Sequence, residues 1–266
     1  MSLAQDLESL AIDIAREAGD LARSRRDAGV AIAATKSALA DIVTEADREV
    51  EALIRARLER ERPEDGFLGE ETGEGSGESG ITWVVDPIDG TVNYAYGIPS
   101  YAVSIAAVRG EPTPEAWEAL AGVVFNPVTG ELFHAAAGEG AKLGMQRLSV
   151  NAEVGPAGGL IATGFGYDPS THAGDLALVG RVMPMARDLR RAGAASLDLA
   201  SVAAGRLDGY FERGLRPWDF AAGALLVTEA GGCFGRAVDD GGPRAPLVVA
   251  ASPAIFDRLS ELAHLS

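Results

Sequence analysis

One stretch, residues 81–97, restricts what this chain can fold into more than any other part of the sequence. It reads ITWVVDPIDGTVNYAYG, and its first five residues are the β-branched, aromatic and aliphatic types that predict a buried strand. Pro87 is expected to stop that strand and to fix a tight turn. Such a turn brings the carboxylates of Asp86 and Asp89 and the carbonyl of Ile88 toward one point, which predicts a group of hard oxygen ligands for a divalent cation.

Directly after the two carboxylates, Gly90, Thr91 and Asn93 predict the opening of a short helix. The unpaired N–H groups and the positive dipole end of such a helix favour a phosphate beside the cation. The alternative is that Asp86 and Asp89 are ordinary turn and capping residues. A cap needs one carboxylate, however, so that alternative leaves the second one unexplained.

Composition bounds the class of protein. With 266 residues and 47% hydrophobic residues, the chain is expected to form one large globular domain or two packed lobes. No apolar run is long enough to span a bilayer and the N-terminus is acidic and amphipathic, so neither a membrane anchor nor a signal peptide is expected. The single cysteine, Cys233, excludes an internal disulfide and fits the cytoplasm.

The formal net charge of −16 argues against a nucleic-acid partner, because a phosphate backbone requires a basic surface. An acidic protein that binds an anionic substrate needs intervening cations. A phosphate-binding function for this chain therefore predicts bound metal.

Two amphipathic helices are predicted in the N-terminal part, at residues 3–25 and from Thr44 to just before Pro63. Asp47 lies on the apolar stripe of the second helix, so its carboxylate is expected to be buried and to need a partner. It is either a residue of the helix N-terminus, with Thr44 as N-cap, or a residue that approaches the metal site, and the two roles are compatible. The intervening residues 26–40 are predicted to be a loop.

A short strand, GFLG, is expected to precede Glu70 and Glu71, and residues 71–80, rich in Gly, Ser and Glu, are expected to form a mobile surface loop. Three apolar runs from Tyr101 onward predict an antiparallel meander. In the second half strands alternate with helices, including one over residues 171–185, which predicts a mixed or parallel sheet with helical cover.

The stretch 154–159, rich in Gly and Pro, is the expected boundary between two lobes, residues 1–153 and 154–266, of one compact unit. The first lobe is expected to hold the two long helices, an antiparallel sheet and the metal-binding turn. The second is expected to hold the mixed sheet and its helices.

Two motifs in this order resemble signatures of the inositol monophosphatase family. The first is the strand followed by DPIDGT within residues 83–97, and the second is Trp218–Asp219 with the small-residue run that ends in EAGG. VTEAD, which ends at Asp47, and GEE, which contains Glu70, are similar to further family motifs. The resemblance implies an α/β (α+β) fold, the layered α-β-α-β-α sandwich shared with fructose-1,6-bisphosphatase.

The resemblance also implies roles for particular residues. It implies two or three Mg²⁺ ions held by Glu70, Asp86, Ile88, Asp89 and Asp219. It implies catalytic roles for Asp47, Glu70, Thr91 and Asp219, and it makes Lys36 an accessory residue. It implies substrate contacts from Asp89, Gly90, Thr91, Gly193, Ala194, Ala195 and Glu212.

Two further assignments have alternatives, and one residue departs from the family pattern. Asp219 follows Pro217 at a helix start, where an acidic side chain has a purely structural use. Glu212 equally fits an exposed charge at a strand end. Ala194 stands where the family often has a hydroxyl-bearing residue, which puts one polar contact to the substrate in question.

The function expected from the resemblance is Mg²⁺-dependent hydrolysis of inositol 1-phosphate, or of a similar small polyol phosphate, by a homodimeric, lithium-sensitive, cytoplasmic enzyme. The alternatives are a related phosphatase acting on fructose 1,6-bisphosphate, histidinol phosphate or NADP, and a non-catalytic metal-binding regulatory protein of the same fold.

Overall fold

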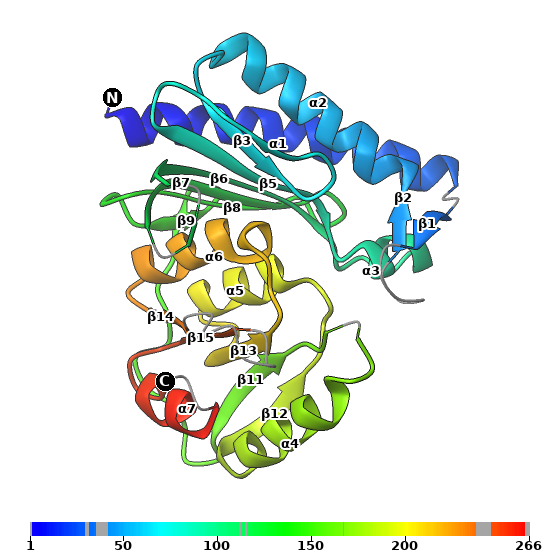
Figure 1. Cartoon of the computed structure of the whole chain (residues 1–266). Coiled ribbons are helices and arrows are strands. Elements are labelled where there is room, and N and C mark those ends of the chain that lie inside the picture. Colours follow the sequence, from blue (N-terminus) through cyan, green and yellow to red (C-terminus); the bar gives the residue numbers. More distant parts are fainter. Residues whose placement is uncertain are drawn as a thin grey trace.

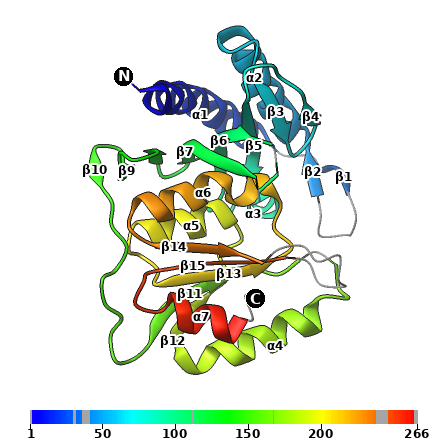
Figure 2. The same ribbon diagram turned by 60° about the vertical axis from the view of Figure 1, so that its left-hand side comes forward.

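The structure is a computed structural model, and it describes residues 2–29, 32–35, 42–111, 113–114, 116–166, 168–237 and 246–263. Its elements stack in five layers, alternately helical and β, as Figures 1 and 2 show. The expected α-β-α-β-α arrangement is confirmed.

Three pairs of helices make the helical layers. The outermost pair is α1 (Leu3–Ala28) and α2 (Glu45–Glu61), which covers one face of the first sheet. The central pair is α5 (Ala195–Ala203) and α6 (Pro217–Glu229), which lies between the two sheets. The last pair is α4 (His172–Val182), followed by a 3₁₀ turn over Met183–Met185, and α7 (Phe256–Ala263).

The first sheet has the strand order β10-β9-β8-β7-β6-β5-β3-β4. Its strands are β3 (Gly66–Gly69), β4 (Gly73–Gly75), β5 (Ile81–Asp89), β6 (Ala102–Gly110), β7 (Trp117–Asn126), β8 (Glu131–Ala136), β9 (Ala141–Leu143) and β10 (Gln146–Arg147). The predicted meander is confirmed in β6, β7 and β8. The sheet is not wholly antiparallel, because β3 pairs with β5 in parallel. Strand β4 forms an antiparallel hairpin with β3 on the side of β3 that faces away from β5. After β4 the chain returns across the sheet and enters β5 running parallel to β3.

The second sheet has the order β12-β11-β13-β15-β14 and is mixed, as predicted. Its strands are β11 (Gly159–Thr163), β12 (Ala186–Arg190), β13 (Gly209–Arg213), β14 (Cys233–Arg236) and β15 (Leu247–Ala251). A separate ribbon pairs β1 (Ile32–Thr35) with β2 (Ile42–Thr44), and α3 (Thr91–Tyr96) follows β5. The first sheet ends before residue 148 and the second begins after residue 158; the division into lobes at residues 153 and 154 stays a prediction.

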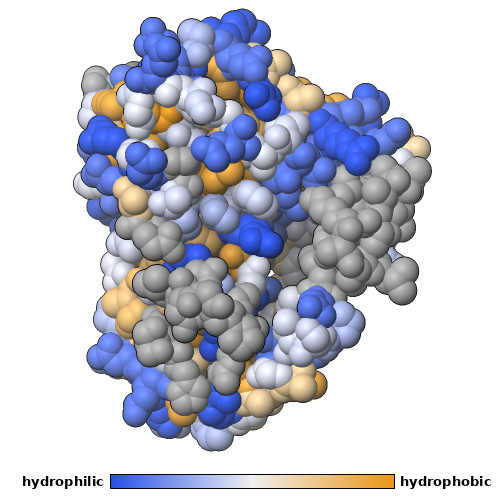
Figure 3. Space-filling model, viewed as in Figure 1, coloured by the Kyte–Doolittle hydropathy of each residue, from blue (hydrophilic) through white to orange (hydrophobic). Residues whose placement is uncertain are grey.

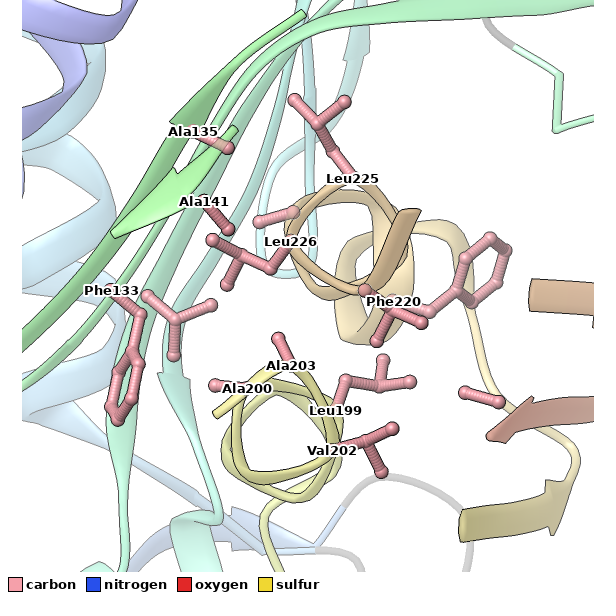
Figure 4. Packing of buried hydrophobic residues seen from close by; sticks show 14 of the residues in the cluster. Phe133, Ala135, Ala141, Leu199, Ala200, Val202, Ala203, Phe220, Leu225 and Leu226 are labelled. Carbon is pink, nitrogen blue, oxygen red and sulfur yellow. The ribbon is translucent and has the colours of Figure 1, made fainter. Parts of the chain in front are cut away.

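The first half of strand β5, from Trp83 to Val85, is apolar because both faces of the strand are covered there. Trp83 and Val85 join the cluster beneath α1 and α2, whereas Val84 joins the cluster around α5 and α6. Figure 4 shows the second cluster, in which side chains of α5 and α6 meet side chains of the first sheet. The end of β5 is therefore held between two helical layers.

Three sequence predictions about local structure were wrong. Pro87 does not stop the strand: β5 runs on to Asp89 through an irregularity between Asp86 and Asp89, where the missing proline N–H interrupts the ladder with β6. The predicted loop at 71–80 contains β4, whose backbone pairs with β3. The predicted loop at 26–40 contains the end of α1 and strand β1.

No helix in the described part of the chain combines the length and the apolar character needed to cross a membrane. The face drawn in Figure 3 is mainly hydrophilic, with hydrophobic residues scattered over it rather than gathered into one large patch.

Candidate active site

Asp86 faces the central helices from the end of β5. It pairs across the sheet with Ser104 of β6, whose hydroxyl donates a 3.3 Å hydrogen bond to the carbonyl of Trp218. Trp218 is the residue before Asp219, so the register of β5 and β6 puts Asp86 beside the start of α6. The Asp86 side chain is 2% exposed, and its Oδ1 accepts a hydrogen bond from the Ile88 N–H at 3.1 Å.

Glu70 is brought to Asp86 by the parallel pairing of β3 with β5. The Glu70 N–H donates to the carbonyl of Val85, and the Glu70 and Asp86 side chains share a hydrogen bond. A buried carboxylate of α2, Glu51, fixes the turn that follows, because it accepts hydrogen bonds from the N–H groups of Glu71 and Thr72 at 2.9 and 2.7 Å. Glu51 was not predicted as part of the site.

Asp89 binds the start of α5. Its Oδ1 accepts a hydrogen bond from the Ala195 N–H at 3.2 Å, and its Oδ2 accepts two from Ser196, at 2.8 Å from the N–H and 2.5 Å from the hydroxyl. Asp89 is 7% exposed. The turn after β5 and the first residues of α5 are therefore joined directly.

Gly90 allows this close approach. Its φ of +87° lies in the left-handed region, and a Cβ there would lie 3.1 Å from the carbonyl oxygen of Gly193 and 3.2 Å from the Cβ of Ala194. Asn93 adds a further link by donating to the carbonyl of Ala192 at 2.8 Å. The structure thus brings the predicted substrate-contact segment against the predicted metal-binding turn.

Asp219 lies in the first turn of α6, where its Oδ2 accepts a 2.6 Å hydrogen bond from the N–H of Arg216. This capping contact is the structural use considered from the sequence. The same carboxylate is close enough to Asp86 for its charge to raise the pKa of Asp86. Both observations hold together, since a carboxylate has lone pairs for more than one partner.

Asp47 lies in the first turn of α2 and is 1% exposed, as its place on the apolar stripe predicted. The Thr91 hydroxyl lies 3.2 Å from Asp47 Oδ1 and 3.1 Å from the carbonyl oxygen of Ile88. Thr91 therefore connects Asp47 of the outer layer to the turn after β5.

Glu212 is the next-to-last residue of β13, and it is close enough to Asp219 for its charge to raise the pKa of Asp219. Its Oε2 accepts a 2.6 Å hydrogen bond from the Tyr210 hydroxyl, and its carboxylate lies directly over Gly164, where a Cβ would be 1.9 Å from Oε2. Burial raises the pKa of Glu212 to about 7, against the hydrogen bond from Tyr210, which lowers it. The sequence alternative of an exposed strand-end charge is wrong.

The carboxylates of Asp86, Asp89 and Asp219 lie close enough together for the negative charge of one to raise the pKa of another. Burial first, and then the charges of Glu70, Asp89 and Asp219, raise the pKa of Asp86 well above its usual range. Burial and the charge of Asp89 do the same to the pKa of Asp219. The pKa of Asp89 is raised by burial to about 6, although its hydrogen bonds from Ser196 and Ala195 lower it.

The residues present fit a hard divalent cation by their chemistry. The donors are carboxylate and carbonyl oxygens, and the mutual repulsion of the carboxylates is what a bound cation would relieve. As they stand, no three Asp, Glu, His or Cys side chains of the described residues are arranged to hold one metal ion.

Several residues of the site could not be read from the sequence. The fold alone brings Ser196 to Asp89 and Asn93 to Ala192, because these partners are far apart in the sequence. Tyr210 lies only two residues from its partner Glu212, but the sequence does not show that the two side chains bond. Lys36, predicted as an accessory residue, lies outside the described residues. The roles assigned to the other predicted residues stay predictions.

Comparison with known proteins shows to which family the chain belongs. A family model described as the inositol monophosphatase family matches residues 3–263. The inositol-1-monophosphatase of Mycobacterium leprae is 42% identical over 277 residues, which are 96% of this chain and 92% of that protein. Nus factor SuhB of Escherichia coli is 42% identical over 226 residues, which are 84% of this chain and 82% of that protein.

Among solved structures, the crystal structure of extragenic suppressor protein SuhB from Bartonella henselae is similar with a TM-score of 0.87 and 35% identity, over 97% of this chain and 98% of that chain. Residues 3–263, which the family model matches, include every carboxylate of the candidate site. The chain belongs to the inositol monophosphatase family.

Proposed function

We propose that this protein is a Mg²⁺-dependent phosphomonoesterase that uses water to hydrolyse inositol 1-phosphate or a similar small polyol phosphate. Family membership supports a phosphatase with a small phosphorylated substrate. The name of the Mycobacterium leprae relative, inositol-1-monophosphatase, supports inositol 1-phosphate in particular. A cytoplasmic location, a homodimer and lithium sensitivity stay predictions that go with this proposal.

The observation that supports it most is the mutual electrostatic coupling of Glu70, Asp86, Asp89 and Asp219, which come from the residue after β3, from β5 and from α6. Two of these carboxylates are buried and two are half-buried. Such a cluster raises the free energy of the folded protein unless a cation or protons compensate it. We assign these four side chains and the Ile88 carbonyl to Mg²⁺, chosen over zinc because the ligands are all oxygen.

Bound Mg²⁺ would supply Lewis-acid activation of water and neutralise charge that develops on the departing ester oxygen. Thr91 and Asp47 are assigned to the attacking water. The Thr91 hydroxyl orients that water, and Asp47, in contact with Thr91, takes up the proton that the water loses. Glu70 is assigned to the same water.

Asp219 is assigned to the leaving-group side, where it would help to hold the cation that neutralises the negative charge on the ester oxygen as the P–O bond breaks. That oxygen then takes a proton from a solvent water, and the polyol leaves as an alcohol. The N–H groups of Gly90 and Thr91, at the start of α3, are assigned to the phosphate oxygens. In-line attack by water then releases phosphate and the polyol without a covalent enzyme intermediate.

Polyol hydroxyls are assigned to the surface formed by Glu212, Gly193 and its neighbours Ala194 and Ala195. Glu212 supplies acceptor oxygens, and Asp89 faces the same segment through its contact with Ala195. Ala194 has no polar side chain, so the contact made there by a hydroxyl in other family members is absent from this substrate surface.

The name Nus factor, carried by the Escherichia coli relative, supports a second candidate: a regulatory role in which hydrolysis is not the function. A phosphate-release assay over inositol, sugar and nucleotide monophosphates separates the two. Mg²⁺-dependent release favours the enzyme, and no release from any member of that panel favours the regulatory role.

Asp219→Asn tests the site directly. The amide oxygen of Asn can still accept the hydrogen bond from Arg216, so the variant is expected to fold, but it removes the charge from a ligand. We expect phosphate release from inositol 1-phosphate to fall at least about 100-fold, since metal-assisted charge stabilisation is worth several kcal/mol.

The matched control is Asp188→Asn, the same substitution at a strongly exposed residue of β12 whose partner is Arg190. It is expected to keep wild-type activity. Normal turnover in Asp219→Asn would show that the ligand assignment is wrong.

A further inference from the structure

Helix α5 begins without a side chain of its own as a cap. Its N-cap residue is Ala194, which makes no side-chain capping bond. The N–H groups of Ala195 and Ser196 are instead bound by Asp89, which lies 106 and 107 residues earlier in the chain. Asp89 is thus the N-terminal cap of α5 as well as a proposed metal ligand.

The hydrogen bonds to Asp89 are unevenly divided between its two oxygens. A carboxylate offers about four lone-pair sites, roughly two on each oxygen. Oδ2 accepts two donors, both from Ser196, whereas Oδ1 accepts one, from Ala195. The two sites of Oδ2 are therefore filled, and one site of Oδ1 remains.

The hydroxyl that fills the second site of Oδ2 has no other evident structural use. Ser196 is 0% exposed, and it follows two alanines at the start of a helix whose other buried residues are apolar except for Asp198. A buried hydroxyl is unfavourable unless it is hydrogen-bonded. Its 2.5 Å bond to Asp89 is what makes Ser196 acceptable at this position.

We infer that Ser196 is a positioning residue, whose hydroxyl occupies Oδ2 of Asp89 and leaves Oδ1 as the single oxygen through which Asp89 binds a divalent cation. This inference rests on the proposed metal-dependent function. Partners that orient a metal ligand from behind typically change metal affinity 10- to 100-fold when they are removed. Ser196 therefore sets metal affinity without touching the metal.

The test measures thermal stabilisation of the full-length protein by Mg²⁺ in the absence of substrate. The protein is first stripped of metal with EDTA, and the melting temperature is followed as Mg²⁺ is added. We expect the Mg²⁺ concentration at half-maximal stabilisation to rise at least about tenfold in Ser196→Ala.

Two further variants separate the hydrogen bond from packing. Ser196→Cys keeps the volume but offers only a weak S–H donor, so it is expected to match the alanine variant within about threefold. Ser252→Ala removes another fully buried hydroxyl. Ser252 follows the last residue of β15, whereas Val248, which pairs with Glu212, lies near the other end of that strand. It is expected to leave the Mg²⁺ midpoint unchanged within about twofold.

The inference is overturned if Ser196→Ala keeps the wild-type midpoint or binds Mg²⁺ more tightly, or if Ser196→Cys restores the wild-type midpoint. It is also overturned, together with the proposed metal site, if the wild-type protein gains no stability from Mg²⁺. The Mg²⁺ titration of the wild-type protein therefore distinguishes failure of the inference about Ser196 from failure of the proposed function.

Discussion

Two main influences act on the pKa of Glu212 in opposite directions: burial raises it and the hydrogen bond from Tyr210 lowers it. Burial dominates and raises the pKa of Glu212 from 4.5 to about 7. Because the folded state binds this proton more tightly than the unfolded state, the contribution of Glu212 to stability is lost as pH rises from about 4.5 through about 7.

Glu212→Gln removes this pH dependence, and the amide oxygen still accepts the bond from Tyr210. In EDTA at pH 8 we expect the variant to be more stable than wild type by up to about 3 kcal/mol, and equal to it near pH 4.5. Urea unfolding at several pH values measures this. Glu139→Gln, at an exposed residue, is the control and should stay within about 0.5 kcal/mol throughout. A variant that is no more stable than wild type at pH 8 contradicts the assigned pKa.

At the scale of single residues, the acidic positions could be predicted because each belongs to a short motif or an apolar pattern. Asp47 was expected to be buried from helical spacing alone, and it is. Ser196 and Glu51 could not be predicted, because their partners lie 107 and about 20 residues away in the chain. A serine beside alanines, or a glutamate within a charged helix, has no local pattern that names its partner.

At the scale of elements, the position of α6 depends on the absence of a side chain on β7. A Cβ at Gly122 would lie 3.0 Å from both the Cα and the carbonyl oxygen of Ala222 in α6. Backbone atoms cannot turn aside as a side chain can. This close contact sets the distance between the first sheet, which holds Asp86, and the helix that holds Asp219.

Gly122→Ala is expected to push α6 away from the sheet. Overpacking of this kind costs about 1–3 kcal/mol of unfolding free energy. Activity per folded molecule should fall as well, because Asp219 moves relative to Asp86. Urea unfolding and phosphate release measure the two effects.

The control is Gly180→Ala in α4, where a Cβ would meet no atom within 4 Å. This substitution should stabilise the helix by about 0.5–1 kcal/mol and leave activity unchanged. Wild-type stability and activity in Gly122→Ala would contradict the role given to this contact.

Elements with a strong local pattern could be predicted and those without one could not. Helices α1, α2, α5 and α6 and strands β6, β7 and β8 follow apolar spacing and turn residues. Strand β4, with the sequence GEG, and strand β12, with mostly exposed residues, have no such pattern and form only because a neighbouring strand offers its edge. The prediction that Pro87 stops the strand was wrong because the hydrogen-bond ladder between β5 and β6 is irregular there and tolerates a residue without an N–H.

At the scale of the whole molecule, the candidate site lies where the first sheet meets the central helices. Asp86 and Asp89 come from the sheet, Asp219 and Ser196 from the central helices, and Asp47 from the outer helical layer. The layered fold was predicted through the family resemblance. The hydrogen bonds that join the layers depend on tertiary packing, which no local pattern encodes.

The account rests on the claim that carboxylates from separate layers hold a divalent cation. The most direct measurement is anomalous diffraction from crystals soaked in Mn²⁺, a cation that suits the same oxygen ligands as Mg²⁺. We predict anomalous density among Asp86, Asp89 and Asp219, with Oδ1 of Asp89 as the nearer of its two oxygens. The claim would be contradicted if Mn²⁺ supports hydrolysis in solution but the crystal shows no anomalous density among these carboxylates, or shows it only elsewhere.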